Sequence, residues 1–187
     1  MPIITNPLYF NFLHIPIQSA SDKILNSMRR NYNSEELYSL FSNLSENYDL
    51  TVSTDVICGF PGETESDFKE TIEFIKNFKP DIINISKFAP RPNTEAKKMK
   101  QVNSITVKER SRELTSIYKK YIRENNKKFL GWRGKALITK FISNKEFPFF
   151  GRNFLYKPIV LKNGELNKKL NVEIINTDHN NLFGKII

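Results

Sequence analysis

The 187-residue chain contains one cysteine and two histidines, and it has no long apolar run. A single cysteine excludes a disulfide framework, and it excludes any zinc or iron–sulfur site built only from cysteines of this chain. No apolar stretch approaches the roughly 20 residues that span a bilayer, and the N-terminus lacks a charged-then-apolar signal pattern. These absences predict a cytoplasmic protein that makes no membrane contact and holds no metal by itself.

The remaining composition is that of a globular protein, with 39% hydrophobic and 26% charged residues, enough for one large or two small domains. Residues 1–90 carry seven Lys/Arg against twelve Asp/Glu, a net charge of −5, whereas residues 91–187 carry 22 against eight, a net charge of +14. This asymmetry favours two modules, the second of which meets a polyanion such as nucleic acid. Solubilising lysine is the alternative explanation of the same count.

The first half of the chain alternates short apolar runs with helical patterns. Strands are predicted at residues 8–17, 50–58 and 82–88, and helices at 21–28, 33–46 and 64–78. Ser21, Asn33 and Thr64 are the expected N-caps of these helices. The apolar face of the third helix is formed by Phe68, Ile72, Ile75 and Phe78. Strands that alternate with amphipathic helices form βαβ units, so the predicted fold class is α/β with a parallel sheet.

The second half follows a proline-rich loop at residues 89–94 and begins with a long basic helix from Thr106 to about Lys128. Its expected apolar side consists of Val107, Leu114, Ile117 and Tyr121. Beyond Gly131, short β-type runs at 135–142, 157–161, 170–175 and 182–187 predict a small antiparallel β-barrel. The predicted domains are therefore residues 1–103, a linker helix at 104–128, and a barrel at 129–187.

Three polar clusters follow the predicted parallel strands, at Gln18-Ser19, at residues 59–63 and at residues 90–94. Ligands of parallel α/β sheets bind at the carboxyl ends of the strands, and Gly59 and Gly62 permit a close backbone approach. A strand-to-helix turn rich in proline and glycine is also common in α/β proteins without a ligand there. The spacing alone leaves both interpretations open.

No pair of residues makes a convincing nucleophile and base, so no catalytic residue is assigned. His14 lies in an apolar strand and is typical of a core or pocket histidine. Cys58 ends a buried strand, where cysteine behaves as a small hydrophobe. Arg29 and Arg30 suit the C-terminal end of a helix, and the alternative is that one of them binds a carboxylate.

The predicted barrel interleaves aromatic and basic residues, namely Trp132, Phe147, Phe149, Phe150, Phe154 and Tyr156 with Arg133, Lys145, Arg152 and Lys157. Small barrels bind single-stranded or looped RNA by stacking bases on aromatic rings while cations hold the phosphates. A core function for about half of these aromatics is the alternative. Together with the basic helix, this composition favours RNA binding.

Four segments occur in the order and spacing of one protein family: residues 14–22 (HIPIQSASD), 28–32 (MRRNY), 55–64 (DVICGFPGET) and 88–94 (FAPRPNT). They resemble the C-terminal half of the radical S-adenosylmethionine (SAM) methylthiotransferases. Residues 81–88 (DIINISKF) and 108–114 (KERSREL) are similar to the archaeal and eukaryotic tRNA branch. That branch converts threonylcarbamoyladenosine at position 37, beside the anticodon, to its 2-methylthio form. Residues 151–153 (GRN) and 156–160 (YKPIV) resemble the TRAM domain of the family, a small OB-like RNA-binding barrel.

The resemblance implies the C-terminal part of a partial (β/α) radical SAM barrel followed by a TRAM barrel. S-adenosylmethionine is the implied cofactor, and its implied contacts are Gln18, Ser19, Arg30, Ile57, Gly59 and Gly62. Of these, Arg30 would bind the methionine carboxylate, since a bidentate fork fits it best, and residues 57–62 would flank the adenine. The barrel would bind the anticodon stem-loop of tRNA through Arg133, Lys135, Arg152, Tyr156 and Lys157.

The sequence also departs from the family. A complete family enzyme carries three cysteines for an auxiliary 4Fe–4S cluster and a CxxxCxxC loop for the cluster that cleaves S-adenosylmethionine, and one cysteine cannot hold either cluster. The resemblance therefore implies that a separate chain with the N-terminal half holds the clusters. Met1 with its short lead-in favours the natural start of a split protein, and truncation is the alternative. Ala20 and Asn93 replace family glycines, and Asn tolerates a left-handed backbone.

The expected function is the C-terminal half of a tRNA methylthiotransferase that adds a methylthio group to threonylcarbamoyladenosine. The alternative is a stand-alone RNA-binding protein whose half barrel is a relic.

Overall fold

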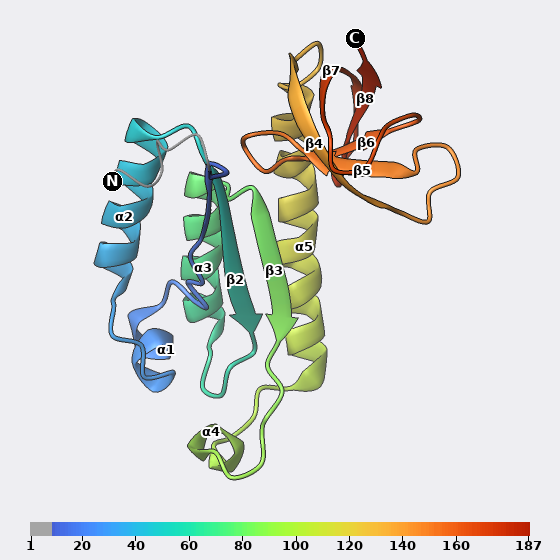
Figure 1. Ribbon diagram of the computed structural model, residues 1–187. Coiled ribbons are helices and arrows are strands. Elements are labelled where there is room, and N and C mark those ends of the chain that lie inside the picture. Colours follow the sequence, from blue (N-terminus) through green and yellow to red (C-terminus); the bar gives the residue numbers. More distant parts are fainter. Residues whose placement is uncertain (1–8) are drawn as a thin grey trace. The chain divides into compact units, whose positions relative to one another are not determined.

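The computed structural model describes residues 9–187, so the lead-in at Met1 and the start of the first predicted strand lie outside the described residues. The chain forms two compact units (Figure 1). One, the α/β unit, contains residues 14–48 and 52–118. The other, the barrel unit, contains residues 49–51 and 119–187 together with the described residues before His14. The domain boundaries expected from the sequence stay a prediction.

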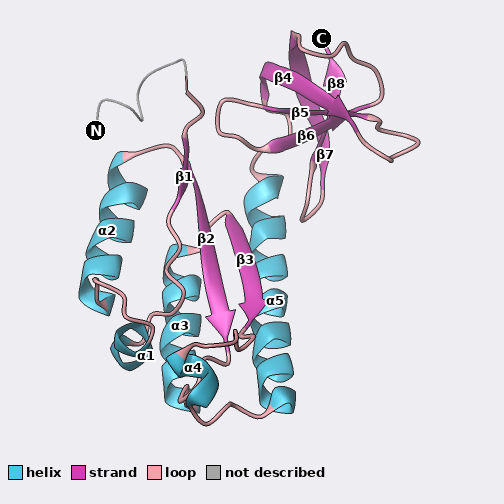
Figure 2. Cartoon of the chain, turned by 60° about the horizontal axis from the view of Figure 1, so that its bottom comes forward, coloured by secondary structure: helices cyan, strands magenta, loops and turns pink. Residues whose placement is uncertain are grey.

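A three-stranded sheet has the order β1 (Phe12–His14), β2 (Thr51–Cys58) and β3 (Ile82–Lys87). All of β3 and nearly all of β2 belong to the α/β unit. Strands β2 and β3 are parallel, as predicted, and their register places Cys58 opposite Lys87. Figures 1 and 2 show α3 beside β2 and α5 beside β3. The carboxyl ends of β2 and β3 consequently meet at one edge of the sheet.

The first predicted strand, residues 8–17, is wrong in extent, because β1 covers only Phe12–His14. Pro16 offers no N–H to a ladder, and Gln18 has a left-handed backbone with φ of 64°. The chain still follows β2 beyond β1, through an isolated parallel bridge between Gln18 and Val56.

Five helices lie among the described residues: α1 (Asp22–Ser27), α2 (Ser34–Asn47), α3 (Glu65–Phe78), α4 (Glu95–Lys98) and α5 (Ser104–Lys127). The predicted caps Asn33 and Thr64 are confirmed, since each forms a capping box with the residue three positions later. Ser21 stands at the N-cap of α1 but makes no cap hydrogen bond. Its hydroxyl donates instead to the Asp67 carboxylate at 2.7 Å. None of these helices is long and apolar enough to cross a bilayer.

The helices bury the apolar faces that their spacing predicts, with two differences. Helix α3 buries Phe68, Ile72 and Ile75, but Phe74 takes the buried place expected for Phe78. Helix α5 buries Val107, Leu114 and Tyr121, whereas Ile117 is half-buried. One charged side chain, Arg110, is buried in the same stripe of α5.

The barrel unit contains a closed five-stranded barrel, shown from another side in Figure 2. Its strands are β4 (Arg133–Phe141), β5 (Phe149–Arg152), β6 (Pro158–Leu161), β7 (Lys169–Thr177) and β8 (Leu182–Ile186). The barrel order is β4-β5-β6-β8-β7. Its core contains Ala136, Ile138, Ile159, Leu161, Val172, Ile174 and Leu182.

The expectation of a purely antiparallel barrel is wrong at one strand pair. Strands β6 and β8 pair in parallel, and the other barrel pairs are antiparallel. Closing an odd number of strands that alternate in direction forces one such pair. Strand β5 was not predicted from the sequence, because it is short and contains a glycine, Gly151. The structure explains this glycine, since an added Cβ would lie 2.4 Å from the Leu137 carbonyl oxygen.

Candidate functional site

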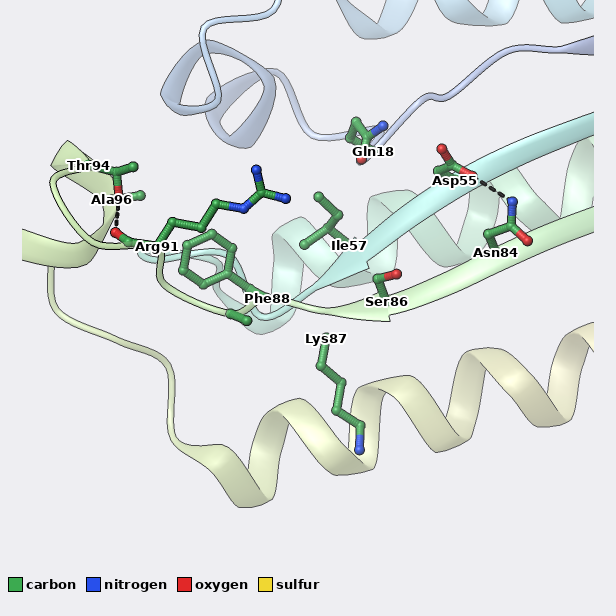
Figure 3. Close-up of a pocket in the computed structure, with 11 residues that line it drawn as sticks. Gln18, Asp55, Ile57, Asn84, Ser86, Lys87, Phe88, Arg91, Thr94 and Ala96 are labelled. Carbon is green, nitrogen blue, oxygen red and sulfur yellow. Dashed lines mark hydrogen bonds between the residues drawn. The ribbon is translucent and has the colours of Figure 1, made fainter.

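A cavity of about 510 Å³ opens at the carboxyl ends of β2 and β3 (Figure 3). Its lining residues come from the loop after β1, from both parallel strands and from the loop after β3; they include Gln18, Asp55, Ile57, Asn84, Ser86, Phe88 and Arg91. Loops converge at this edge of a parallel sheet, which is why ligands bind there. The cavity therefore lies where the sequence predicted a binding site.

Gln18 is fixed in the cavity wall by its backbone. Its N–H donates to the Asp55 carbonyl at 2.8 Å, and its carbonyl accepts from the Ile57 N–H at 2.9 Å. The side chain is 7% exposed, and its amide makes no hydrogen bond with any other described residue. An amide that lines a cavity and has no hydrogen-bond partner among the described residues is a group that a ligand can satisfy.

The loop after β3 places a cation, Arg91, and an aromatic ring, Phe88, in the cavity wall across from Gln18. Figure 3 shows the Arg91 side chain extending toward the space between Gln18 and Ile57, while Lys87 points away toward α5. The Phe88 ring packs edge-on against Phe60 at 5.0 Å, which holds its orientation.

Two groups of the loop after β3 keep its backbone in place. The Thr94 hydroxyl donates to the Arg91 carbonyl at 2.8 Å. Asn93 has a φ of 62°, which confirms the left-handed conformation expected at this replaced glycine. The Arg91 backbone is therefore part of a hydrogen-bonded turn.

A hydrogen-bonded row crosses the sheet at the edge of the cavity. The Asp55 carboxylate accepts from Asn84 Nδ2 at 2.8 Å, and its second oxygen lies 3.2 Å from His14 Nε2. The other ring nitrogen of His14 lies 3.0 Å from the Ser53 hydroxyl. His14 is therefore a partly exposed histidine that orients a carboxylate of the cavity lining. Burial of its ring in the apolar core, the other sequence interpretation, is wrong.

The Gly59–Gly62 turn is held by α5. A Cβ on Gly59, whose φ is 79°, would lie 2.3 Å from Val107 Cγ2, so glycine is required there for the packing of α5. The Gly59 N–H donates to Glu63 at 2.8 Å, and Glu63 also accepts from Arg110 Nη1 at 2.7 Å. Burial raises the pKa of Glu63, although Gly59 and Arg110 both oppose that shift.

The predicted cofactor residues separate into two groups. Gln18 and Ile57 line the cavity together, whereas the remaining predicted residues are absent from the described lining. The Ser19 hydroxyl is buried and lies 3.2 Å from the Thr71 hydroxyl. Arg30 keeps a buried Nε atom without a hydrogen-bond partner among the described residues. Their roles toward a cofactor stay predictions.

Sequence reasoning assigned no role to Asn84 and Ser86, which line the cavity from β3. The signal was present, because the two polar residues alternate with Ile83 and Ile85 and therefore share one face of the strand. Asp55 and Arg91 were quoted only as parts of motifs. Their place at the cavity follows from the pairing of β2 with β3.

The barrel unit contains a second cavity, of about 320 Å³, which brings together Lys135 and Arg152 from the predicted RNA-binding set. Of the other members of that set, Arg133 lies 3.4 Å from the Glu173 carboxylate. Tyr156 packs against two rings, and Lys157 is 6% exposed with its Nζ over the Phe129 ring.

Arg152 is partly desolvated by its aromatic neighbours. Its guanidinium carbon lies 3.8 Å from the Tyr156 ring centroid and 5.2 Å from that of Phe150, and Nη1 donates to the Tyr156 carbonyl at 2.6 Å. Burial lowers the pKa of Arg152, but a guanidinium stays charged at neutral pH. The side chain is a fixed cation at the rim of the second cavity.

The described residues do not form an iron–sulfur or metal site. Among residues 9–187, no three His, Cys, Asp or Glu side chains lie together as a set of ligands. Cys58, the one cysteine of the chain, is fully buried, and burial together with Glu63 raises the pKa of its thiol to about 12. A cluster needs several accessible thiolates, which this chain does not have.

Comparison with known proteins shows which class the chain resembles. Residues 6–75 match the Radical SAM superfamily. The chain also superposes on coproporphyrinogen III oxidase from Escherichia coli, described as a radical SAM enzyme, with a TM-score of 0.52 and 13% identity over 90% of this chain and 41% of the other. At that identity the likeness concerns the fold alone. Complete radical SAM enzymes use S-adenosylmethionine and a 4Fe–4S cluster.

The particular relatives are tRNA-modifying enzymes by name. The chain is 36% identical over 95% of its length to the "Probable threonylcarbamoyladenosine tRNA methylthiotransferase" of Archaeoglobus fulgidus. It is equally identical over 92% of its length to the threonylcarbamoyladenosine tRNA methylthiotransferase of Homo sapiens. The chain spans 41% of the archaeal and 30% of the human protein. The recognition of a radical SAM methylthiotransferase sequence is confirmed.

Proposed function

We propose that this chain is the C-terminal half of a tRNA methylthiotransferase that modifies threonylcarbamoyladenosine. In this proposal its α/β unit binds S-adenosylmethionine, and its barrel, a TRAM domain, binds the tRNA. The enzyme acts in the cytoplasm. A separate N-terminal half, carried by another chain, supplies the iron–sulfur clusters. The observation that carries the proposal is the cavity at the ends of β2 and β3, with the Gln18 side chain in its wall.

The residues of this cavity fit the chemistry of S-adenosylmethionine. The Gln18 amide offers both a donor and an acceptor to a nucleoside, and the Ile57 and Phe88 side chains offer apolar contact to an adenine ring. Arg91 supplies a cation for the methionine carboxylate, and Asp55 supplies a carboxylate for the methionine ammonium. The methionine part of the cofactor carries a carboxylate and an ammonium and its adenosine part carries an aromatic base, so these groups match it.

The work of this chain is binding and orientation. S-adenosylmethionine bound beside an iron–sulfur cluster supplies the radical chemistry of this class. His14 and Asn84 hold the Asp55 carboxylate from two sides, so that it is preorganised to accept a hydrogen bond from a bound amine. The clusters do not fit this chain, because its single cysteine is buried.

The proposal is tested by co-expression with a chain that carries the cysteine clusters. We expect a 1:1 complex that binds S-adenosylmethionine and produces 2-methylthio-threonylcarbamoyladenosine in tRNA, measured by mass spectrometry of nucleosides. Arg91→Ala and Gln18→Leu should each weaken cofactor binding by about 1.5–3 kcal/mol in isothermal titration. Lys87→Ala is the matched control, because Lys87 borders the same cavity but points away from it.

Two results would overturn the proposal. One is a chain that stays monomeric beside such a partner. The other is cofactor affinity that does not change in either cavity variant while RNA binding persists. The second result favours the alternative of a stand-alone RNA-binding protein with a relic half barrel.

A further inference from the structure

We propose that the second cavity, in the barrel unit, is a binding site for one unpaired nucleotide of an RNA strand, and that Tyr9, Phe10 and Phe154 stack on its base. The inference deepens the proposed RNA-binding role of the barrel and rests on it. We call this cavity the aromatic–basic pocket. It has a volume of about 320 Å³, and its aromatic and basic lining residues are Tyr9, Phe10, Phe154, Lys135, Arg152 and Lys169.

The pocket is built by a segment far away in the sequence. The Asn11 N–H donates to the Phe154 carbonyl at 2.8 Å, and the Phe10 ring meets Tyr156 edge-on at 5.1 Å. A neighbouring anchor is the Thr51 hydroxyl, which donates to the Leu155 carbonyl at 2.6 Å. These contacts attach the residues before β1 to the loop between β5 and β6. The aromatic wall is therefore a built feature of the barrel unit.

The aromatic rings of the pocket are available to a ligand. Tyr9 is 61% exposed, Phe154 48% and Phe10 38%, which is unusual for three large apolar side chains gathered around one cavity. Leu137 adds an apolar surface from β4. Flat apolar walls of this kind suit a flat aromatic ligand, and stacking on such rings tolerates any base.

The cations of the pocket stand on neighbouring barrel strands. Ala136 and Ile138 of β4 point into the barrel core, so Lys135 and Leu137 of the same strand face outward. The β4–β7 register places Lys169 opposite Leu137. Arg152 adds the third cation from β5, and none of the described residues that line the pocket is acidic. Three cations without a carboxylate favour an anion, and RNA offers a phosphate next to every base.

The wall also contains an unsatisfied donor. Asn153 lines the pocket and is fully buried, and its Oδ1 accepts from the Lys157 N–H at 3.0 Å. Its Nδ2 has no hydrogen-bond partner among the described residues. A buried donor left unpaired is costly, and an acceptor on a base edge or a sugar would relieve that cost after a small adjustment of the loop. Aromatic faces, three cations and the unpaired Nδ2 donor of Asn153 together match a nucleotide.

The test is a titration of the full chain with a fluorescein-labelled single-stranded oligoadenylate, followed by anisotropy across a salt series. Tyr9→Ala and Phe154→Ala should each weaken binding by about 5- to 150-fold, the range for loss of one stacked base. Tyr9→Phe and Phe154→Trp keep a ring and should retain affinity. Phe141→Ala is the matched control, because Phe141 is 58% exposed on β4 but lies outside the pocket lining.

The charge part of the proposal has its own readout. The plot of log K against log salt has a negative slope. Lys135→Ala and Lys169→Ala should each make it shallower by about 0.7, the value for one phosphate contact on a single strand. Lys69→Ala, which removes an exposed lysine of the α/β unit, should leave that slope unchanged. A duplex RNA of the same length should compete weakly, since its bases are not free to stack.

The possible failures are distinguishable. If the chain binds the oligoadenylate but the Tyr9 and Phe154 variants bind as the parent does, the pocket is overturned and the proposed RNA-binding role stands. Equal binding of duplex and single strand also overturns the pocket. A chain that binds no RNA at any salt concentration overturns both proposals. Thermal unfolding of each variant shows whether a loss of affinity comes from a loss of fold.

Discussion

The guanidinium of Arg110 lies 2.7 Å from the Glu63 carboxylate, and neither side chain is more than 6% exposed. Glu63 also receives the Gly59 N–H at 2.8 Å, so one buried carboxylate links α5 to the turn that follows β2. A buried ion pair of this kind adds little net stability, because the desolvation cost of the two charges offsets much of their attraction. Its main effect is to fix the positions of the two elements that it joins. Its consequence is a fixed turn beside the end of β2, the strand that carries Ile57 into the cavity.

Removal of Arg110 should strongly destabilise the protein. Arg110→Ala leaves the Glu63 carboxylate buried without its counter-ion, which costs about 3–5 kcal/mol. Urea unfolding followed by circular dichroism measures this loss. Arg112→Ala, two residues along the same helix but exposed, is the control and should change stability by less than about 0.5 kcal/mol. Similar values for both variants would contradict a structural role of the pair.

Asp67 should make the protein sensitive to acid. Burial by itself would raise the pKa of Asp67, but hydrogen bonds from Lys23, Thr64 and Ser21 outweigh it and hold that pKa well below its usual range. The unfolded chain therefore takes up the proton first, at a pKa of about 3.9. The stability that Asp67 contributes is present above this pH and is lost as the pH falls below it.

The matching variant is Asp67→Asn. We expect a loss of about 1.5–3 kcal/mol at neutral pH and a flatter decline of stability in acid, measured by urea unfolding across a pH series. Glu73→Gln changes an exposed carboxylate on the same helix and should keep the acid decline of the parent. An unchanged acid decline in Asp67→Asn would show that other groups cause it.

Cys58 should not react with iodoacetamide in the folded chain. Its side chain is fully buried and its thiol pKa is raised to about 12, so the reactive thiolate is almost absent at about pH 8. Mass spectrometry should find labelling only after unfolding in urea. Labelling at the rate of a free thiol under native conditions would show that the end of β2 opens, contrary to the packing described above.

Arg30 is the arginine that the family resemblance assigns to the methionine carboxylate, whereas Arg91 is the arginine that lines the cavity. If Arg30 adds a second charged contact, it should matter for the cofactor more than for RNA. In the assembled enzyme, Arg30→Ala should weaken S-adenosylmethionine binding by about 1.5–3 kcal/mol, the usual scale of a charged hydrogen bond, and leave tRNA binding almost unchanged. Arg29→Ala, its exposed neighbour, is the control. Unchanged cofactor affinity together with weaker tRNA binding would assign Arg30 to the RNA surface.

Much of the fold could be predicted because local signals and tertiary packing agree. The capping boxes at Asn33 and Thr64 and the parallel pairing of β2 with β3 follow from caps, periodicity and strand–helix alternation. Strand β5 could not be predicted, since four residues with one glycine carry no periodic pattern. The parallel β6–β8 pair is a property of barrel closure, which no single segment encodes.

The candidate sites show the same division. Gln18 was found from its place after a predicted strand, and Ile57 was found through the family resemblance. Arg110 could have been found as an arginine in an otherwise apolar helical stripe. The joining of Tyr9 and Phe10 to Arg152 had no sequence signal, because more than 140 residues separate them and only packing decides such a contact.

The sequence by itself determined the class of this protein and the residue types at its strand ends, because motifs, caps and hydrophobic periodicity are local properties of the chain. Only the tertiary structure decided how those residues are used. It placed Asp55 between His14 and Asn84, made Gly59 a contact for Val107, and put Gln18 in a cavity wall. Burial and pairing depend on neighbours that are remote in sequence, so they are fixed only when the strands and helices have packed together.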